Sequence, residues 1–153
     1  MRRGDIAARR RAARARHSEA DTLLDSMSES QWQDSVIDVC QRLGYRVYGA
    51  LKSARRIPNA DGGERWVKNY LGDGKGWPDV VAFQKSQPYR RFAFELKDEN
   101  PNSKPSPEQV EWLEALDAHG FLCYVLRPRD RDNLERLLQG LPWVDENILT
   151  EVR

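Results

Sequence analysis

The stretch from residue 76 to residue 97 constrains the fold of this chain more than any other part of its sequence. It opens with Gly76-Trp77-Pro78-Asp79, continues through an apolar run and a turn at 85–89, and closes with Glu95-Leu96-Lys97. Two strand-like segments joined by a turn predict an antiparallel β-hairpin. The start of one strand then lies beside the end of the other, and residues two apart share a face. Asp79 should therefore lie next to Glu95 and Lys97.

Two carboxylates and an amine at a sheet edge suit the hydrolysis of a phosphodiester. Hard divalent cations such as Mg²⁺ take oxygen ligands, often one or two carboxylates together with water and substrate phosphate oxygens. A bound metal lowers the pKa of a water molecule and neutralises charge on the attacked phosphate. Each half of the pattern also has a structural explanation, because Pro-Asp is a common turn and Glu-x-Lys on a strand is commonly a solvated charge pair.

Two helices flank the hairpin in the sequence. The first is predicted to run from its cap Ser28 to a stop at Gly44, and the second from its cap Ser106 to a stop at Gly120. Gln109 sits where a capping box needs it, which explains this residue in structural terms.

Two polar residues of the first helix, Glu29 and Gln33, lie one turn apart and therefore share a face. Taken alone, they are surface residues in a first turn, where an acid interacts favourably with the helix dipole.

Four segments resemble the PD-(D/E)XK nuclease superfamily and, within it, the VRR-NUC family of virus-type replication and repair nucleases. They lie at 28–33, 76–79, 95–97 and 106–109, and read Ser-Glu-Ser-Gln-Trp-Gln, Gly-Trp-Pro-Asp, Glu-Leu-Lys and Ser-Pro-Glu-Gln. The resemblance runs from about residue 28 to residue 128. It implies an α/β fold with a PD-(D/E)XK restriction-endonuclease-like core, a central mixed β-sheet flanked by helices in the order αβββαβ.

The same resemblance implies the members of a site. Asp79 and Glu95 would hold one or two Mg²⁺ or Mn²⁺ ions, with the backbone carbonyl of Leu96 as a further ligand. Lys97 would position or activate the attacking water. Three residues on the helices complete the expected site: Glu29 as an additional metal ligand, Gln33 as its neighbour, and Gln109 as a catalytic residue that orients Lys97 or the phosphate.

The net charge of +1 conceals an uneven distribution of charge along the chain. Residues 1–17 contain seven arginines and one acid, Asp5, so this segment carries +6 and the rest of the chain carries −5. Residues 1–27 are predicted to be a flexible basic arm that contacts DNA phosphates through Arg9, Arg10 and Arg11. The alternatives are a solubilising tail and an organellar presequence, and the missing apolar face weakens the second.

A long polar segment, residues 52–75, separates a first predicted strand at 45–51 from the hairpin. It is predicted to be a loop. Basic residues with interleaved aromatic residues suit a groove for nucleic acid, and four contacts are expected there: Lys52, Arg55, Arg56 and Lys75. A solvated insertion explains the composition almost as well.

The remaining elements complete one predicted domain at 28–140, followed by a tail at 141–153 without a clear pattern. The apolar segment 121–126 reads as a strand buried on both faces, which should run parallel to the Glu95 strand. Asp130 is predicted to cap a last helix at 133–139. Cys40 and Cys123 are expected to be buried free thiols.

Together these features predict a metal-dependent endodeoxyribonuclease that acts in phage DNA replication, recombination or repair, with nicking or structure-selective cutting. The alternatives are a non-catalytic nucleic-acid-binding protein on a nuclease fold and, third, a ribonuclease or sugar-phosphate hydrolase. DNA is the expected partner; paired cutting would need a homodimer, and targeting would come from a partner protein. No apolar run approaches the roughly 20 residues that cross a bilayer, so no membrane partner is expected. A phage-encoded enzyme would act in the cytoplasm of its bacterial host.

Overall fold

The computed structural model describes residues 22–24, 26–50, 54–68 and 72–142, and within 54–57 and 65–68 it describes the backbone only. The elements follow the order α2 (Glu29–Arg42), β1 (Tyr45–Gly49), β2 (Ala54–Pro58), β3 (Glu64–Lys68), β4 (Val80–Gln84), β5 (Arg91–Leu96), α3 (Pro107–Ala118), β6 (Leu122–Leu126), the short 3-10 helix η1 (Pro128–Asp130) and α4 (Arg131–Leu138). None of the described helices is both long enough and apolar enough to span a membrane.

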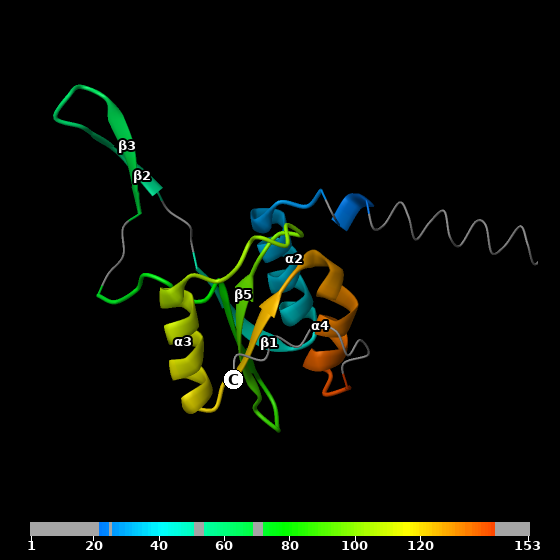
Figure 1. Cartoon of the computed structure of the whole chain (residues 1–153). Coiled ribbons are helices and arrows are strands. Elements are labelled where there is room, and N and C mark those ends of the chain that lie inside the picture. The colour runs from blue at the N-terminus through cyan, green and yellow to red at the C-terminus, as the bar shows by residue number, and fades with distance from the viewer. Residues whose placement is uncertain (1–21, 25, 51–53, 69–71, 143–153) are drawn as a thin grey trace, which may run out of the picture.

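Four strands form a mixed sheet in the order β1-β4-β5-β6 (Figure 1). β4 pairs with β1 and with β5 in the antiparallel sense, and β6 runs parallel to β5. Val80 lies opposite Phe94, so Asp79, which precedes β4, lies beside the end of β5. The predicted antiparallel hairpin and the predicted parallel strand are both confirmed.

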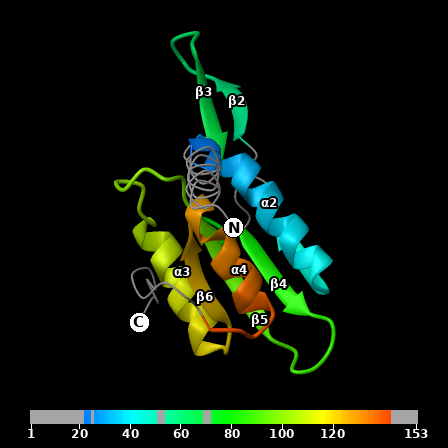
Figure 2. The ribbon, with the colours of Figure 1, turned by 90° about the vertical axis from the view of Figure 1, so that its right-hand side faces the viewer.

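Helices cover both faces of this sheet, with α2 and α4 on one face and α3 on the other (Figures 1 and 2). Alternate residues of β5, namely Phe92, Phe94 and Leu96, enter the larger apolar cluster with α2 and α4. Ala93 enters the smaller cluster beneath α3. Glu95 follows Ala93 by two residues and therefore faces the same side of the sheet as α3. An α/β fold with a mixed sheet flanked by helices is thus confirmed.

The starts of α2 and α3 and the state of the cysteines are also as predicted. Capping boxes form at the first residues of both α2 and α3. Cys40 and Cys123 are buried free thiols. Burial raises the pKa of Cys40 to about 12 and that of Cys123 to about 11, so neither thiol is reactive at neutral pH.

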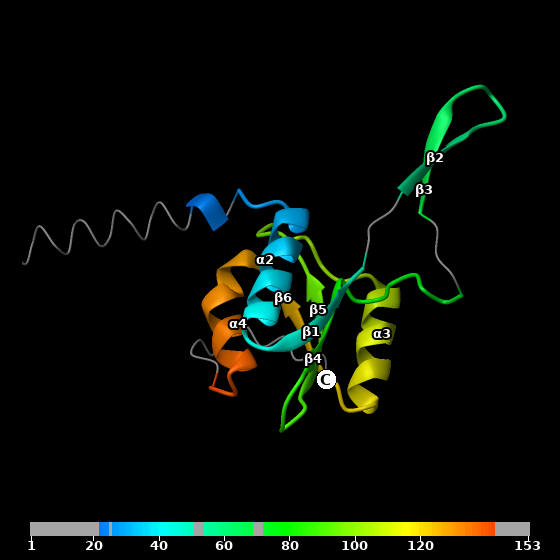
Figure 3. The same cartoon turned by 180° about the vertical axis from the view of Figure 1, so that it is seen from behind.

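Three predictions about the elements were wrong. Segment 52–75 contains a two-stranded antiparallel hairpin, β2–β3, which stands off from the main sheet (Figures 1 and 3). The last helix begins at Arg131 rather than at residue 133. Asp130 is its N-cap residue, but its side chain makes no capping hydrogen bond to this helix; Oδ2 instead accepts a hydrogen bond from the backbone N–H of Arg127 at 2.8 Å. The strand β6 is not buried on both faces as predicted. It is an edge strand of the four-stranded sheet, and its residue Leu122 is 41% exposed.

Candidate active site

Glu95 is the centre of a buried polar cluster at the end of β5. Its side chain is 0% exposed. Oε1 accepts hydrogen bonds from Lys97 Nζ at 2.6 Å and from Gln109 Nε2. Oε2 is buried and has no hydrogen-bond donor. One oxygen of this carboxylate is therefore fixed by two donors, while the other has none.

Asp79 lies beside Glu95, as the hairpin pattern predicted, and is 4% exposed. Its Oδ2 accepts a hydrogen bond from the backbone N–H of Leu96 at 2.8 Å, which ties the start of β4 to the end of β5. Its carbonyl oxygen accepts a second hydrogen bond from the N–H of Ala50, also at 2.8 Å. Both the side chain and the backbone of Asp79 are thereby held by neighbouring strands.

Gln33 supports the backbone at the same point. Its Nε2 donates to the carbonyl oxygen of Asp79 at 2.9 Å and to that of Ala50 at 3.0 Å. The amide thus joins α2 to the ends of β1 and β4. Gln33 was expected as a neighbour of the site, and the structure gives it a specific part: it fixes the carbonyl group of Asp79.

Gln109 combines a cap with a contact to Glu95. Its Oε1 accepts from the backbone N–H of Ser106 at 2.7 Å, which completes the capping box. The same oxygen accepts from Lys97 Nζ at 3.4 Å. Because the oxygen is held at the helix start, the NH₂ group of the amide is directed at Glu95. A single orientation of the Gln109 amide therefore both caps α3 and contacts Glu95 and Lys97.

Burial dominates the electrostatics of the cluster. The pKa of Glu95 is raised to about 7, by burial first and by the negative charge of Asp79 second, whereas the hydrogen bond from Lys97 lowers it. Lys97 is itself 7% exposed and forms an ion pair with Glu95. Two adjacent carboxylates are offset by one ammonium group, so the cluster favours a further positive charge.

The donor set fits a hard divalent cation that uses few protein ligands. Asp79 and Glu95 supply carboxylate oxygens, and Glu95 Oε2 is a buried oxygen without a donor. Within the described part of the chain no three His, Cys, Asp or Glu side chains form a group that could hold a metal. The predicted part of Glu29 as an additional ligand stays a prediction. Two carboxylates, with water and phosphate oxygens as the other ligands, are an arrangement that Mg²⁺ accepts.

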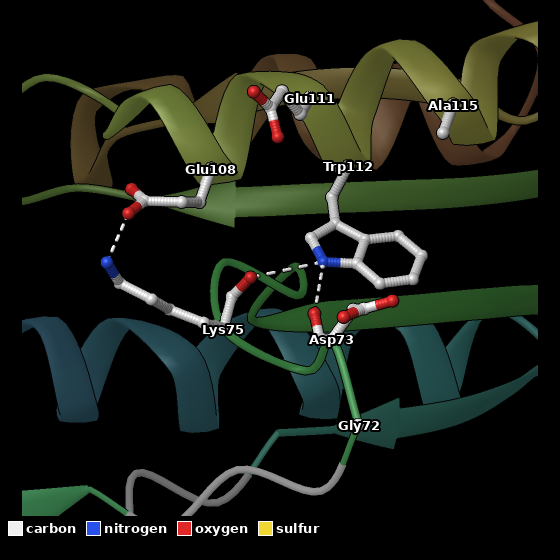
Figure 4. Close-up of a pocket in the computed structure, with 7 residues that line it drawn as sticks. All are labelled: Gly72, Asp73, Lys75, Glu108, Glu111, Trp112 and Ala115. Atoms are coloured by element: carbon white, nitrogen blue, oxygen red, sulfur yellow. Dashed lines mark hydrogen bonds and ion pairs between the residues drawn. The ribbon is translucent and has the colours of Figure 1, made fainter.

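A pocket of about 520 Å³ has no side chain of this cluster in its lining (Figure 4). It is lined by the segment before Gly76 and by the outer face of α3: Gly72, Asp73, Lys75, Glu108, Glu111, Trp112 and Ala115. Trp112 Nε1 donates to the carbonyl oxygens of Asp73 at 3.0 Å and Lys75 at 3.1 Å. Lys75, an expected DNA contact, forms an ion pair with Glu108.

Arg127 positions the loop between Lys97 and α3, and sequence reasoning missed it. Its guanidinium group donates to the carbonyl oxygens of Asp98, of Asn100 at 3.0 Å and of Ser103 at 2.6 Å. An arginine directly after an apolar strand was the available signal, but the carbonyl groups that it binds are set by the path of a loop.

The other expected DNA contacts are not described at the level of side chains. Arg9, Arg10, Arg11 and Lys52 lie outside the described residues. Arg55 and Arg56 lie in β2, for which only the backbone is described.

Comparison of the chain with protein-family models, with curated proteins and with solved structures found no match. The resemblance to the VRR-NUC family therefore remains a prediction from four short segments, and the geometry of the polar cluster carries the functional argument.

Proposed function

We propose that this protein is a metal-dependent endodeoxyribonuclease with a PD-(D/E)XK core of the VRR-NUC type, which hydrolyses phosphodiester bonds in DNA. Its partner is DNA, its cofactor Mg²⁺ or Mn²⁺, and its place of action the cytoplasm of a bacterial host. A role in phage replication, recombination or repair follows from the family resemblance. The proposal rests above all on Glu95, whose buried Oε2 has no donor beside a second carboxylate.

A purely structural salt bridge explains this observation poorly. A buried polar atom without a partner costs roughly 1–3 kcal/mol, and a buried ion pair often stabilises a fold no better than apolar residues. Groups arranged at such a cost are typical of functional sites.

The residues have separate parts in the proposed reaction. Asp79 and Glu95 would hold the cation, which when bound acidifies water and neutralises phosphate charge. Lys97 Nζ uses one N–H on Glu95 Oε1 and another on Gln109 Oε1, which leaves its third N–H for a water or a phosphate oxygen. Gln109 holds both Glu95 and Lys97 in place, and Gln33 fixes the backbone of Asp79.

A cleavage assay tests the proposal. Labelled duplex, single strand, flap, four-way junction and RNA would be incubated with the protein in Mg²⁺, Mn²⁺ or EDTA. The wild type should cut DNA only with metal, and Glu95→Ala should not cut. Glu114→Ala, an exposed glutamate on α3, is the matched control and should cut normally.

Undiminished cutting by purified Glu95→Ala would refute the site. Salt-sensitive binding of DNA without cutting by the wild type would favour the non-catalytic alternative. Cutting confined to RNA would move the substrate class to ribonucleic acid.

A further inference from the structure

The β2–β3 hairpin is a separate two-stranded ribbon. Its strands pair over five residues each, from Ala54 opposite Lys68 to Pro58 opposite Glu64. A tight turn joins them, in which Asn59 N donates to Gly63 O at 2.6 Å. Among the described residues, the two strands contact mainly each other. All three views show the ribbon projecting from one end of the molecule (Figures 1–3).

Both ends of this ribbon connect to the candidate active site. Before the ribbon, Ala50 is hydrogen-bonded through its N–H to the carbonyl oxygen of Asp79 at 2.8 Å. After the ribbon, Trp112 on α3 holds Asp73 and Lys75 by their carbonyl oxygens. The chain then passes through Gly76 directly to Asp79. Whatever the ribbon binds is therefore brought to the side of the molecule that carries Asp79 and Glu95.

The ribbon is basic in a molecule whose residues after 17 carry −5 overall. Its two strands contain four basic residues, Arg55, Arg56, Arg65 and Lys68, against one acid, Glu64. In the register, Arg55 and Arg65 belong to one face, and Arg56 and Lys68 to the other. A ribbon with basic positions on both faces can meet phosphates on two sides at once. A ribbon that lies on a flat anionic surface needs basic positions on one face only.

We propose that the β2–β3 hairpin enters the major groove of double-helical DNA, which makes duplex DNA the substrate class of the site; this deepens, and rests on, the proposed nuclease function. The major groove is about 12 Å wide and admits a two-stranded β-ribbon, whereas the minor groove, at about 6 Å, takes one only when the duplex is deformed to widen it. Five residues per strand extend about 17 Å, or roughly half of a helical turn of DNA.

The test measures binding separately from cutting. Full-length protein would be titrated into labelled duplex and into the matching single strand in EDTA at several salt concentrations, followed by fluorescence anisotropy. Two double variants each remove one basic face: Arg55→Ala/Arg65→Ala and Arg56→Ala/Lys68→Ala. The control, Arg46→Ala/Lys85→Ala, removes two charges from exposed positions at the opposite end of the main sheet.

Each hairpin variant should weaken duplex binding by roughly tenfold or more and reduce the slope of log K against log salt by about 1.8, or 0.9 for each lost phosphate contact. The control should bind like the wild type. Unfolding curves should be unchanged, because the ribbon stands apart from the main sheet. Methylation of guanine N7, which lies in the major groove, should interfere with binding, and a minor-groove ligand should not compete.

An unchanged salt slope in both hairpin variants, an equal loss of affinity for single strand and duplex, or displacement by the minor-groove ligand would overturn the proposal. So would a wild type that does not bind duplex at all. Failure of the nuclease function looks different: duplex binding and its response to the hairpin variants would persist, but no metal would induce cutting.

Discussion

Glu95 is a carboxylate whose environment opposes its charge. It is fully buried beside Asp79, and its two donors, from Lys97 and Gln109, both use Oε1. Without a cation the protonated form is therefore favoured well above the usual pH range of a glutamate, with a pKa of about 7. A bound divalent cation would reverse this preference by supplying positive charge to both carboxylates.

This environment predicts how stability depends on pH. The pKa of Glu95 is 4.5 in the unfolded chain and about 7 in the folded chain. At a pH between these two values, the folded chain retains a proton that the unfolded chain has lost. The contribution of Glu95 to the free energy of unfolding should therefore fall as pH rises through this range, by roughly 3 kcal/mol in all. Thermal or denaturant unfolding in EDTA from pH 5 to pH 7 measures it.

Glu95→Gln carries no titratable group and should lack this part of the slope, whereas Glu114→Gln should retain it. Identical slopes in the wild type and Glu95→Gln would show that Glu95 ionises normally in the folded chain.

Lys97 gives a second prediction at this scale. Lys97→Ala should lower kcat for cleavage by about 10²–10⁴, the usual contribution of a positioned proton-transfer group. Binding of Mn²⁺ should persist but shift toward higher pH, because Lys97 no longer lowers the pKa of Glu95. Lys104→Ala removes an exposed charge from the nearby loop and should leave kcat unchanged. A Lys97→Ala enzyme with normal kcat would remove this residue from the mechanism.

At the scale of elements, the site depends on a close contact between the 72–79 segment and the start of α3. Gly76 has φ +85°, and a Cβ at this position would lie 2.5 Å from the backbone carbon of Glu108. The segment leading to Asp79 therefore runs against the turn of α3 that carries Gln109. Trp112 reinforces the contact by its hydrogen bonds to Asp73 and Lys75 and by an edge-on contact with Trp77.

The molecule contains a matched control for this contact. Gly44 also has φ +85°, but a Cβ there would meet nothing within 4 Å. Gly44→Ala should cost about 1 kcal/mol for the left-handed backbone alone. Gly76→Ala should cost at least about 1 kcal/mol more, because backbone atoms must also move apart, and should slow cleavage. Urea unfolding of both variants measures the difference, and equal losses of stability would show that the contact is not tight.

Elements whose signals are local were predictable from the sequence. The alternation around the turn at 85–89 gave the β4–β5 hairpin, and with it the pairing of Asp79 with Glu95. Ser106 and Gln109 gave the start of α3. Contacts that depend on the path of a loop were not predictable: the carbonyl groups bound by Arg127 and Gln33 are brought together only by the fold. The β2–β3 ribbon was missed because charged residues interrupt both of its strand sequences, which therefore lack the apolar pattern of a core strand.

The molecule as a whole concentrates its polar chemistry at one end of the sheet. α2 and α3 both begin at this end, the β2–β3 hairpin projects from it, and the turn between β4 and β5 lies at the other (Figures 1 and 3). Gln33 comes from the early turns of α2 and Gln109 from the first turn of α3. The main sheet thus positions the site, while the ribbon remains separate enough to bind a large ligand without altering the core.

We propose that Asp79 and Glu95 form a metal centre rather than a buried salt bridge with Lys97. The most direct test is a titration of the protein with Mn²⁺, followed by the electron paramagnetic resonance signal of the free ion, for the wild type, Glu95→Gln and the control Glu114→Gln. The wild type should bind Mn²⁺ saturably, Glu95→Gln should lose this binding and Glu114→Gln should keep it. Equal binding by all three proteins, or no binding by a folded wild type, would contradict the proposal.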